Sequence, residues 1–187
     1  NHQYSKTFDF EKKFRAYSRK YLATNIEYFS FLRPLYELQI AKLFAGYPQY
    51  FSAFVSCNEA HKTDSGSKKP TGKWCGKCSK CLFVFACLYP FVEEKQLIKI
   101  FKKNLLKDKS LTPIREQLTG KRGFKPFECV GTTKESLAAF AMCSQKQKEG
   151  LHAYPRILQS WNTQNFLPKS LDAILRSDML ALAEALR

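Results

Sequence analysis

Apolar residues recur every three or four positions along much of the chain, which is the spacing of amphipathic helices. Near the start, Phe10, Phe14, Tyr17 and Tyr21 follow this spacing, so we expect a helix over residues 7–22 with its aromatic stripe in a core. The pattern therefore predicts a mainly α fold.

Proline, glycine and capping residues divide the rest of the chain into further helices. The run 82–88 is apolar almost all round, as a buried helix is, and it ends near Pro90. Thr132 and Glu135 have the spacing of a capping box, so a helix should begin there. The other expected helices are Pro34–Gly46, residues 93–106, residues 113–120, and a last one from Pro168 with Leu171, Ile174, Leu175, Leu182 and Leu186 as its apolar stripe.

Four cysteines have the arrangement of a metal site. Cys75, Cys78 and Cys81 lie at two-residue gaps, and Cys57 follows a short aromatic and β-branched run, residues 50–55, that favours a strand. The polar stretch 59–73 between them predicts an exposed loop. Four thiolates would complete a tetrahedral zinc site with no position for water, so we expect a structural Zn²⁺ that staples this loop to the helix after Cys81.

Two other readings of the cysteines stay open. An iron-sulfur cluster would need a different spacing, because Cys87 follows Cys81 by five residues and is not followed directly by proline. The thiols could also bind no metal, and His61 could replace one of them. Ligand type and spacing favour zinc.

The segment that ends in Cys129 differs from the other cysteine contexts. Cys87 and Cys143 lie in apolar helical surroundings and are expected in the core, whereas Cys129 lies in a loop before the capped helix. A thiol near a helix N-terminus can have a lowered pKa, and the N–H groups there suit an anion. We therefore take Glu128 and Cys129 as the candidate pair for proton transfer and Thr132 as a candidate phosphate contact. The alternative is that Cys129 is an ordinary half-buried loop residue without a chemical role.

Length and charge limit the classes of protein. The 187 residues suffice for one domain or fragment, 1–187, with a metal-binding turn and buried helix at 57–91. The net charge is +15, and many basic residues fall between 95 and 125, which fits either a polyanion partner or a solvated helix face. No signal peptide or membrane-spanning run is visible, and the cysteines fit a reducing compartment, so we expect a cytoplasmic protein with no membrane partner.

Several segments together resemble the carboxyl-terminal half of the UDP-N-acetylmuramoyl-L-alanyl-L-glutamate epimerases. The cysteine block with its flanking Trp and Phe residues is the most specific of them. Its Ser-Cys and Cys-Gly-x-Cys-x-x-Cys arrangement is also similar to the zinc region of 7-cyano-7-deazaguanine synthases, which have a PP-loop ATP pyrophosphatase fold. The segments are Tyr4–Phe8, Phe29–Leu35, Glu37–Ala41, Ser56–Asn58, Trp74–Phe85 and Glu128–Thr132 with Glu135.

The resemblance implies an enzyme that uses ATP, with Mg²⁺, to activate the terminal glutamate of a UDP-linked muramoyl dipeptide as an acyl-adenylate. It implies inversion of the α-carbon and release of AMP and pyrophosphate, in peptidoglycan precursor synthesis. Lys6 and Arg33 are then candidate anion contacts for the substrate. No Ser-Gly-Gly-x-Asp-Ser-like pyrophosphate loop, Walker loop or dinucleotide fingerprint occurs in the sequence. We expect that loop in an upstream half of the same polypeptide, which would make the whole α/β and leave this chain alone inactive.

Two further function classes remain. One is another PP-loop-type adenylating enzyme that acts on a purine or a tRNA. The other is a non-enzymatic zinc module that binds nucleic acid through residues 95–125, which needs exposed aromatic side chains among the basic ones. Phe101 and Phe124 are expected in the core instead, so nucleic acid is the less favoured partner.

Overall fold

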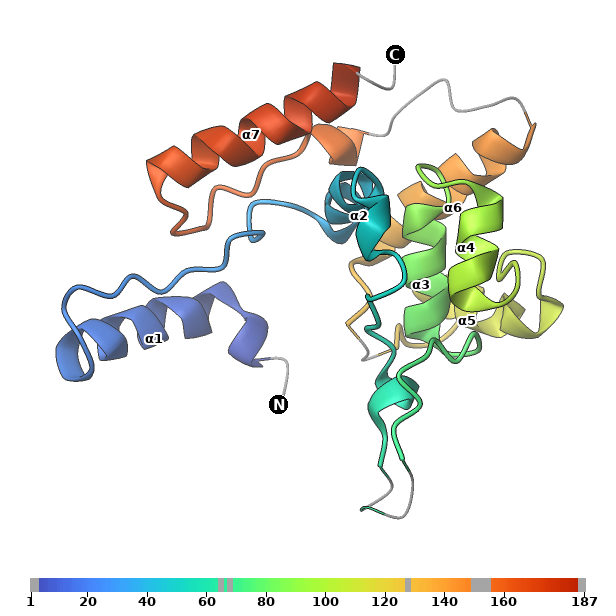
Figure 1. The fold of residues 1–187 in the computed structure, drawn as a ribbon, viewed down its shortest axis with the longest axis horizontal. Helices are drawn as coiled ribbons and strands as arrows, with labels where there is room; N and C mark the ends of the chain where they lie inside the picture. Colours follow the sequence, from blue (N-terminus) through green and yellow to red (C-terminus); the bar gives the residue numbers. More distant parts are fainter. Residues whose placement is uncertain (1–3, 64–65, 67–68, 127–128, 149–155, 185–187) are drawn as a thin grey trace. The chain divides into compact units, whose positions relative to one another are not determined.

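The structure is a computed structural model that describes residues 4–63, 66, 69–126, 129–148 and 156–184. These residues form helices and loops and contain no β-strand, as the mainly α prediction requires (Figure 1). The strand expected at residues 50–55 was wrong: the 3₁₀ helix η2 (Pro48–Tyr50) is followed by a turn. The amides of this segment form local hydrogen bonds, as Phe54 N–H does with the Tyr50 carbonyl at 3.2 Å. They are therefore not available to pair with a neighbouring strand.

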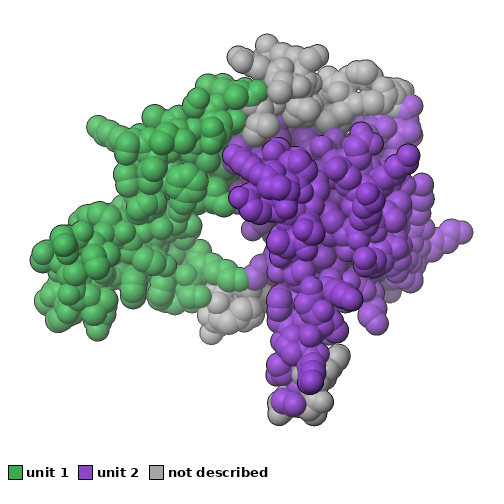
Figure 2. Space-filling model, viewed as in Figure 1, with its two compact units in different colours: residues 1–35, 160–187 green, residues 36–159 purple. Residues whose placement is uncertain are grey.

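The chain divides into two compact units, one of residues 1–35 with 160–187 and one of residues 36–159 (Figure 2). We call them unit 1 and unit 2. No helix in the described part of either unit is both long enough and apolar enough to cross a bilayer.

Unit 2 is built around α3 (Ser79–Leu88). This helix contacts four others within the unit (Figure 1). Every residue of α3 except Val84 is buried, which confirms the buried helix expected at 82–88. The surrounding helices are α2 (Glu37–Ala45), α4 (Glu94–Phe101), α5 (Thr112–Leu118) and α6 (Thr133–Lys148). Two short 3₁₀ helices, η3 (Asn58–His61) and η4 (Lys109–Leu111), lie in the connections, and a third, η5 (Arg156–Gln159), follows α6.

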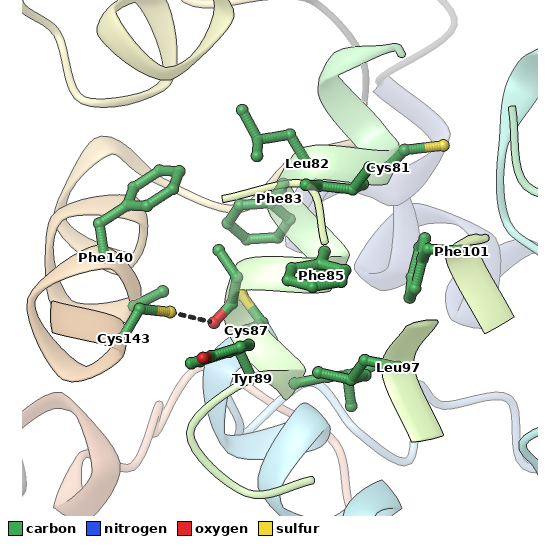
Figure 3. Close-up of a cluster of buried hydrophobic side chains, with 14 of the residues drawn as sticks. Cys81, Leu82, Phe83, Phe85, Cys87, Tyr89, Leu97, Phe101, Phe140 and Cys143 are labelled. Carbon is green, nitrogen blue, oxygen red and sulfur yellow. Dashed lines mark hydrogen bonds between the residues drawn. The ribbon is translucent and has the colours of Figure 1, made fainter. Parts of the chain in front are cut away.

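Aromatic rings and thiols fill the core of unit 2 (Figure 3). The rings of Phe85 and Phe101 meet edge to face, with centroids 5.3 Å apart. The Cys143 thiol donates to the carbonyl oxygen of Ala86 at 3.3 Å, and Cys87 is buried beside it on α3. Both thiols are core residues, as predicted.

Helix α4 ends earlier than the apolar spacing predicted. We expected helix over 93–106, but Lys102 has a left-handed backbone with φ 69°, and its N–H bonds the Ile98 carbonyl. The chain then turns, and the Asn104 side chain accepts from the Leu106 amide at 2.9 Å. Phe124, expected in the core, is 89% exposed because it lies in the loop after α5.

Unit 1 contains η1 (Tyr4–Lys6), α1 (Phe8–Tyr21) and α7 (Lys169–Glu184). Thr7 caps α1 by accepting from the Phe10 amide at 3.1 Å, so the helix lies where expected. Its aromatic stripe was wrongly assigned to a core, because Tyr17 is 52% and Tyr21 61% exposed.

The buried face of α1 holds Glu11 and Ser18 instead. Of the α7 stripe, Leu175 is buried and Ile174 is exposed, whereas the side chain of Leu182 and all of Leu186 lie outside the described part.

Candidate metal centre

The four predicted cysteines converge at the start of α3. Their sulfur atoms lie within 4.8 Å of one another. Cys57 precedes η3, Cys75 lies in the following loop, Cys78 caps α3 and Cys81 lies in its first turn. The tight turn that aligns them uses Gly76 at φ 67°, a conformation that favours glycine.

Three of the sulfur separations are close to those around one tetrahedral ion. The Sγ atoms are 3.8 Å apart for Cys57 and Cys78, 3.6 Å for Cys75 and Cys81, and 3.5 Å for Cys78 and Cys81. Zinc–sulfur bonds of about 2.3 Å in a tetrahedron place the sulfurs about 3.8 Å apart. An iron-sulfur cluster would separate the thiolates further, because several iron and sulfide atoms lie between them.

The other residues considered for the site lie elsewhere. Cys87 is fully in the core of unit 2, and His61 is an exposed residue at the end of η3. Neither belongs to the group of potential ligands that the described residues form, which consists of the four cysteines. All potential metal ligands in this group are therefore cysteine sulfur atoms.

The thiols strongly influence one another. Hydrogen bonding with the Cys81 thiol lowers the pKa of Cys78 to about 5, and the same contact raises the pKa of Cys81. Burial raises the pKa of Cys75. Because several thiolates at this spacing repel one another, a cation is needed to hold all four in the charged form.

Aromatic side chains fix the loop that carries Cys75. The adjacent Trp74 is buried, and its Nε1–H donates to the Phe54 carbonyl at 3.0 Å. Its ring lies against Phe54 and Phe101, with centroids 5.2 and 4.7 Å away. The cysteine loop is thereby anchored to the core of unit 2.

Cys129 and Thr132 lie in a second polar region of unit 2. The Thr132 hydroxyl accepts from the Glu135 amide at 3.1 Å, and the Glu135 carboxylate accepts from the Thr132 amide, which confirms the capping box. The Thr132 amide, which an anion would use, therefore already has a partner, and the Thr132 hydroxyl oxygen accepts one hydrogen bond. Cys129 is half-buried, and Glu128 lies outside the described residues.

Glu135 has a second partner that the sequence pattern missed. It is 2% exposed, and its other carboxylate oxygen accepts from the Glu37 amide, the first residue of α2, at 2.6 Å. One buried carboxylate thus caps two helices, and a carboxylate is favourable at both positive ends. A Cβ at position 131 would lie 2.5 Å from the Phe83 ring, so only glycine lets Phe83 pack this closely against the backbone.

Two lysines hold the loop before α6, and sequence reasoning missed them as well. The buried Lys80 ammonium donates to the Cys129 carbonyl, and Lys125 donates to the carbonyls of Val130 and Gly131 at 2.6 Å each. Burial lowers the pKa of Lys125. One sign of the Lys80 contact was present in the sequence, which is the occurrence of a lysine in the mostly apolar α3.

Lys6 and Arg33 come together in unit 1. Arg33 forms an ion pair with the buried Glu11 and donates to the Lys6 carbonyl at 3.2 Å. Glu11 also accepts from the Ser30 amide at 3.2 Å. Arg33 therefore already has an ion-pair partner, Glu11, which the aromatic pattern of α1 did not predict. Lys6 is exposed.

Comparisons with known proteins identify the family. Residues 53–180 match the family described as the MurL C-terminal domain. No solved structure matches the chain significantly. The curated relatives are named UDP-N-acetyl-alpha-D-muramoyl-L-alanyl-L-glutamate epimerase.

The relative from Xanthomonas oryzae pv. oryzae is 40% identical over 146 residues, which are 78% of this chain and 32% of the relative. Those from Micromonospora sp. and Salinispora tropica are each 38% identical, over 79% and 78% of this chain and 32% and 31% of their own lengths. The chain thus spans about a third of the curated relatives that it matches. With more than half of its residues matched, the chain belongs to the MurL C-terminal domain family.

Proposed function

We propose that this chain is the carboxyl-terminal part of an epimerase that inverts the terminal L-glutamate of UDP-N-acetylmuramoyl-L-alanyl-L-glutamate. The observation that carries this proposal is the match of residues 53–180, together with relatives at 38–40% identity that are named for this activity. The reaction makes a peptidoglycan precursor, which we place in the cytoplasm.

ATP would make the inversion chemically accessible. The α-proton next to an ionised carboxylate is weakly acidic, because its removal would give two negative charges on one small group. Attack of a carboxylate oxygen on the α-phosphorus of ATP, bound with Mg²⁺, forms a P–O bond and expels pyrophosphate. The acyl-adenylate has lost the carboxylate charge, so a general base can remove the α-proton and an acid can return a proton to the other face. Water then cleaves the mixed anhydride and releases AMP and the inverted carboxylate.

We assign ATP binding to a part of the protein beyond this chain, with a PP-loop-like fold. The support is the lack of any pyrophosphate-loop motif in these 187 residues and the threefold greater length of the relatives. The chain would then contribute substrate contacts and a fixed scaffold.

The four cysteines are proposed to hold one structural Zn²⁺. All-sulfur ligation at these separations fits zinc, and four thiolates leave no ligand position for a reacting water. Bound zinc would supply folding energy, while Cys57, Cys75, Cys78 and Cys81 would join the polar loop to α3.

Cys129, with Glu128, remains our candidate for moving the α-proton. In support, the Cys129 thiol is half-buried and its backbone is held by Lys80, so its position is defined by α3. Thr132, Lys6 and Arg33 are weaker candidates for substrate contacts, because Thr132 and Arg33 already have polar partners in the structure.

The test uses a full-length protein that includes this chain. Purified protein, ATP, Mg²⁺ and the UDP-linked dipeptide should yield D-glutamate after acid hydrolysis, with one AMP formed per inversion at early times, as measured by chiral chromatography. Cys129→Ala should lower kcat by at least about 100-fold, the contribution of a positioned proton-transfer group. Cys143→Ala, which removes a core thiol, is the control. Absence of inversion would overturn the proposed function, and an unchanged rate in Cys129→Ala would remove this thiol from the mechanism.

A further inference from the structure

An open cavity of about 500 Å³ lies in unit 2 next to the cysteine loop. None of the residues that line it is acidic. Its volume falls within the range of small-molecule sites, about 300–1,000 Å³. The lining comes from the turn after α2, the loop before Cys75 and helix α4, and comprises Pro48, Phe51, Ser52, Phe54, Val55, Gly72, Lys73, Trp74, Gln96, Lys99, Ile100 and Lys102.

One side of the cavity is a fixed aromatic wall. Phe51 and Trp74 are 8% and 7% exposed, and Phe54 lies between them in the sequence and packs on Trp74. Phe44, from α2, contacts both Phe51 and Phe54, with centroids 5.3 and 4.7 Å away. Because the rings hold one another, the wall is rigid, and a planar group can contact the partly exposed Phe54 and the edges of the other rings with little cost of ordering the protein.

The other side carries three exposed lysines, Lys73, Lys99 and Lys102. Within the described residues, no carboxylate forms an ion pair with any of them. The neighbouring lysines differ, since Lys62 pairs with Glu59, Lys103 with Asp108 at 2.5 Å and Lys107 with Glu94 at 3.2 Å. Three lysines without a carboxylate partner among the described residues thus line an aromatic cavity.

Lys102 occupies a backbone position that suits glycine. Its φ of 69° disfavours a residue with a Cβ. Its ammonium donates to the Lys99 carbonyl at 3.1 Å, which holds it beside the C-terminal end of α4, and an ammonium has three donors in all. A lysine at this strained position places a positive charge at the cavity.

We propose that this cavity binds a nucleoside polyphosphate, with the base against the Trp74 and Phe51 wall and the phosphates at Lys73, Lys99 and Lys102. A simple anion would make no use of the rings, and an apolar ligand would leave three ammonium groups facing it. A base with phosphates satisfies both sides of the cavity. The uridine diphosphate of the proposed substrate supplies this chemistry, since ATP binding is assigned to another part of the protein, and this choice rests on the proposed function.

Trp74 itself can report binding. The chain has two tryptophans, and the other, Trp161, lies in unit 1 under the Arg176 guanidinium. In a Trp161→Phe background, UDP should quench the remaining fluorescence in a saturable way. Uridine and pyrophosphate, which each supply half of the ligand, should bind at least about tenfold more weakly. An ATP titration tests the choice of ligand, because ATP should bind more weakly than UDP.

Lysine variants separate a binding role from a structural one. Lys99→Ala and Lys102→Gly should each weaken nucleotide binding about five- to tenfold, as loss of a charge-assisted contact does. Lys102→Gly should also leave the melting temperature unchanged or higher, since glycine suits a positive φ. Lys95→Ala, which removes an exposed charge of α4 outside the cavity, is the matched control and should bind as the parent does.

Any of these results would overturn the proposal: no saturable quenching by UDP, pyrophosphate binding as tightly as UDP, tighter binding of ATP or of a random oligonucleotide, or an equal loss in Lys95→Ala. Failure here is distinct from failure of the proposed function. Glutamate inversion by a full-length protein carrying Lys99→Ala and Lys102→Gly, with unchanged KM for both substrates, would remove the nucleotide site and leave the epimerase. Nucleotide binding without glutamate inversion would instead support the nucleotide site and overturn the proposed epimerase function.

Discussion

Helices α1 and α3 show opposite relations between sequence pattern and burial. The α1 helix has a regular aromatic stripe, yet Tyr17 and Tyr21 are more than half exposed while Glu11 is buried. The α3 helix has almost no polar face, and even Ser79 and Lys80 are buried. Apolar spacing therefore tells which residues share a helix face, whereas the elements packed around a helix decide which face is covered.

The two units consequently depend on different interactions. Unit 2 has an extensive apolar core around α3 and the cysteine group at its end. In unit 1, a buried ion pair between Glu11 and Arg33 and ring contacts along α1 are the prominent interactions. We expect changes in unit 2 to cost far more stability than changes on the aromatic stripe of α1.

Removal of the proposed Zn²⁺ should have the largest effect. Structural zinc contributes about 10–16 kcal/mol, as much as or more than the total stability of a typical domain, about 5–15 kcal/mol. A chelator, or Cys81→Ser, should therefore abolish the near-ultraviolet circular dichroism of unit 2. Cys129→Ser is the control outside the cysteine group. Retention of the full signal without metal would show that the apolar core alone suffices.

Truncation of the core should follow in size. Phe85→Ala removes a fully buried ring from α3 and should lower the free energy of unfolding by about 3–5 kcal/mol in urea titrations. Val84→Ala, at the one α3 position that is not buried, should cost about 1 kcal/mol or less. Equal losses would mean that the burial of α3 does not determine stability.

The double cap should have an intermediate effect. Glu135→Gln keeps a hydrogen-bond acceptor but removes the charge at the ends of α2 and α6, so we expect a loss of about 1–3 kcal/mol. Glu116→Gln, whose carboxylate lies 3.6 Å from Arg122 at the surface, should change the stability by less than about 0.5 kcal/mol. Similar losses in the two variants would refute the assigned role of Glu135.

The smallest effect is expected on the stripe of α1. Tyr17→Ser should lower the free energy of unfolding by about 1 kcal/mol or less, because the ring is 52% exposed and the variant loses only surface ring contacts with Phe14 and Tyr21. A loss of 2 kcal/mol or more, measured by thermal melting, would mean that the stripe is buried in solution and would erase the contrast with α3.

The features that were predictable are those encoded within a few residues. The cysteine spacing, the Thr132–Glu135 capping box and the uniformly apolar run of α3 each specify a local geometry, and the structure contains all three. Features that depend on distant partners were not predictable. Glu11 is buried because Arg33, 22 positions away, neutralises it.

Two wrong expectations have the same origin. The run 50–55 has strand-forming residues but no neighbouring strand, so its amides bond locally. The apolar spacing of α4 continues past Phe101, but Lys102 takes a left-handed conformation that spacing cannot reveal. The second cap made by Glu135 was also hidden, since Glu37 lies 98 positions away.

X-ray absorption at the zinc edge of the purified chain is the sharpest test of the proposed four-cysteine zinc site. We expect about one zinc per chain, surrounded by four sulfur atoms at about 2.3 Å, with no nitrogen or oxygen neighbour. Iron with short iron–iron distances, or zinc with fewer than four sulfur ligands, would contradict it.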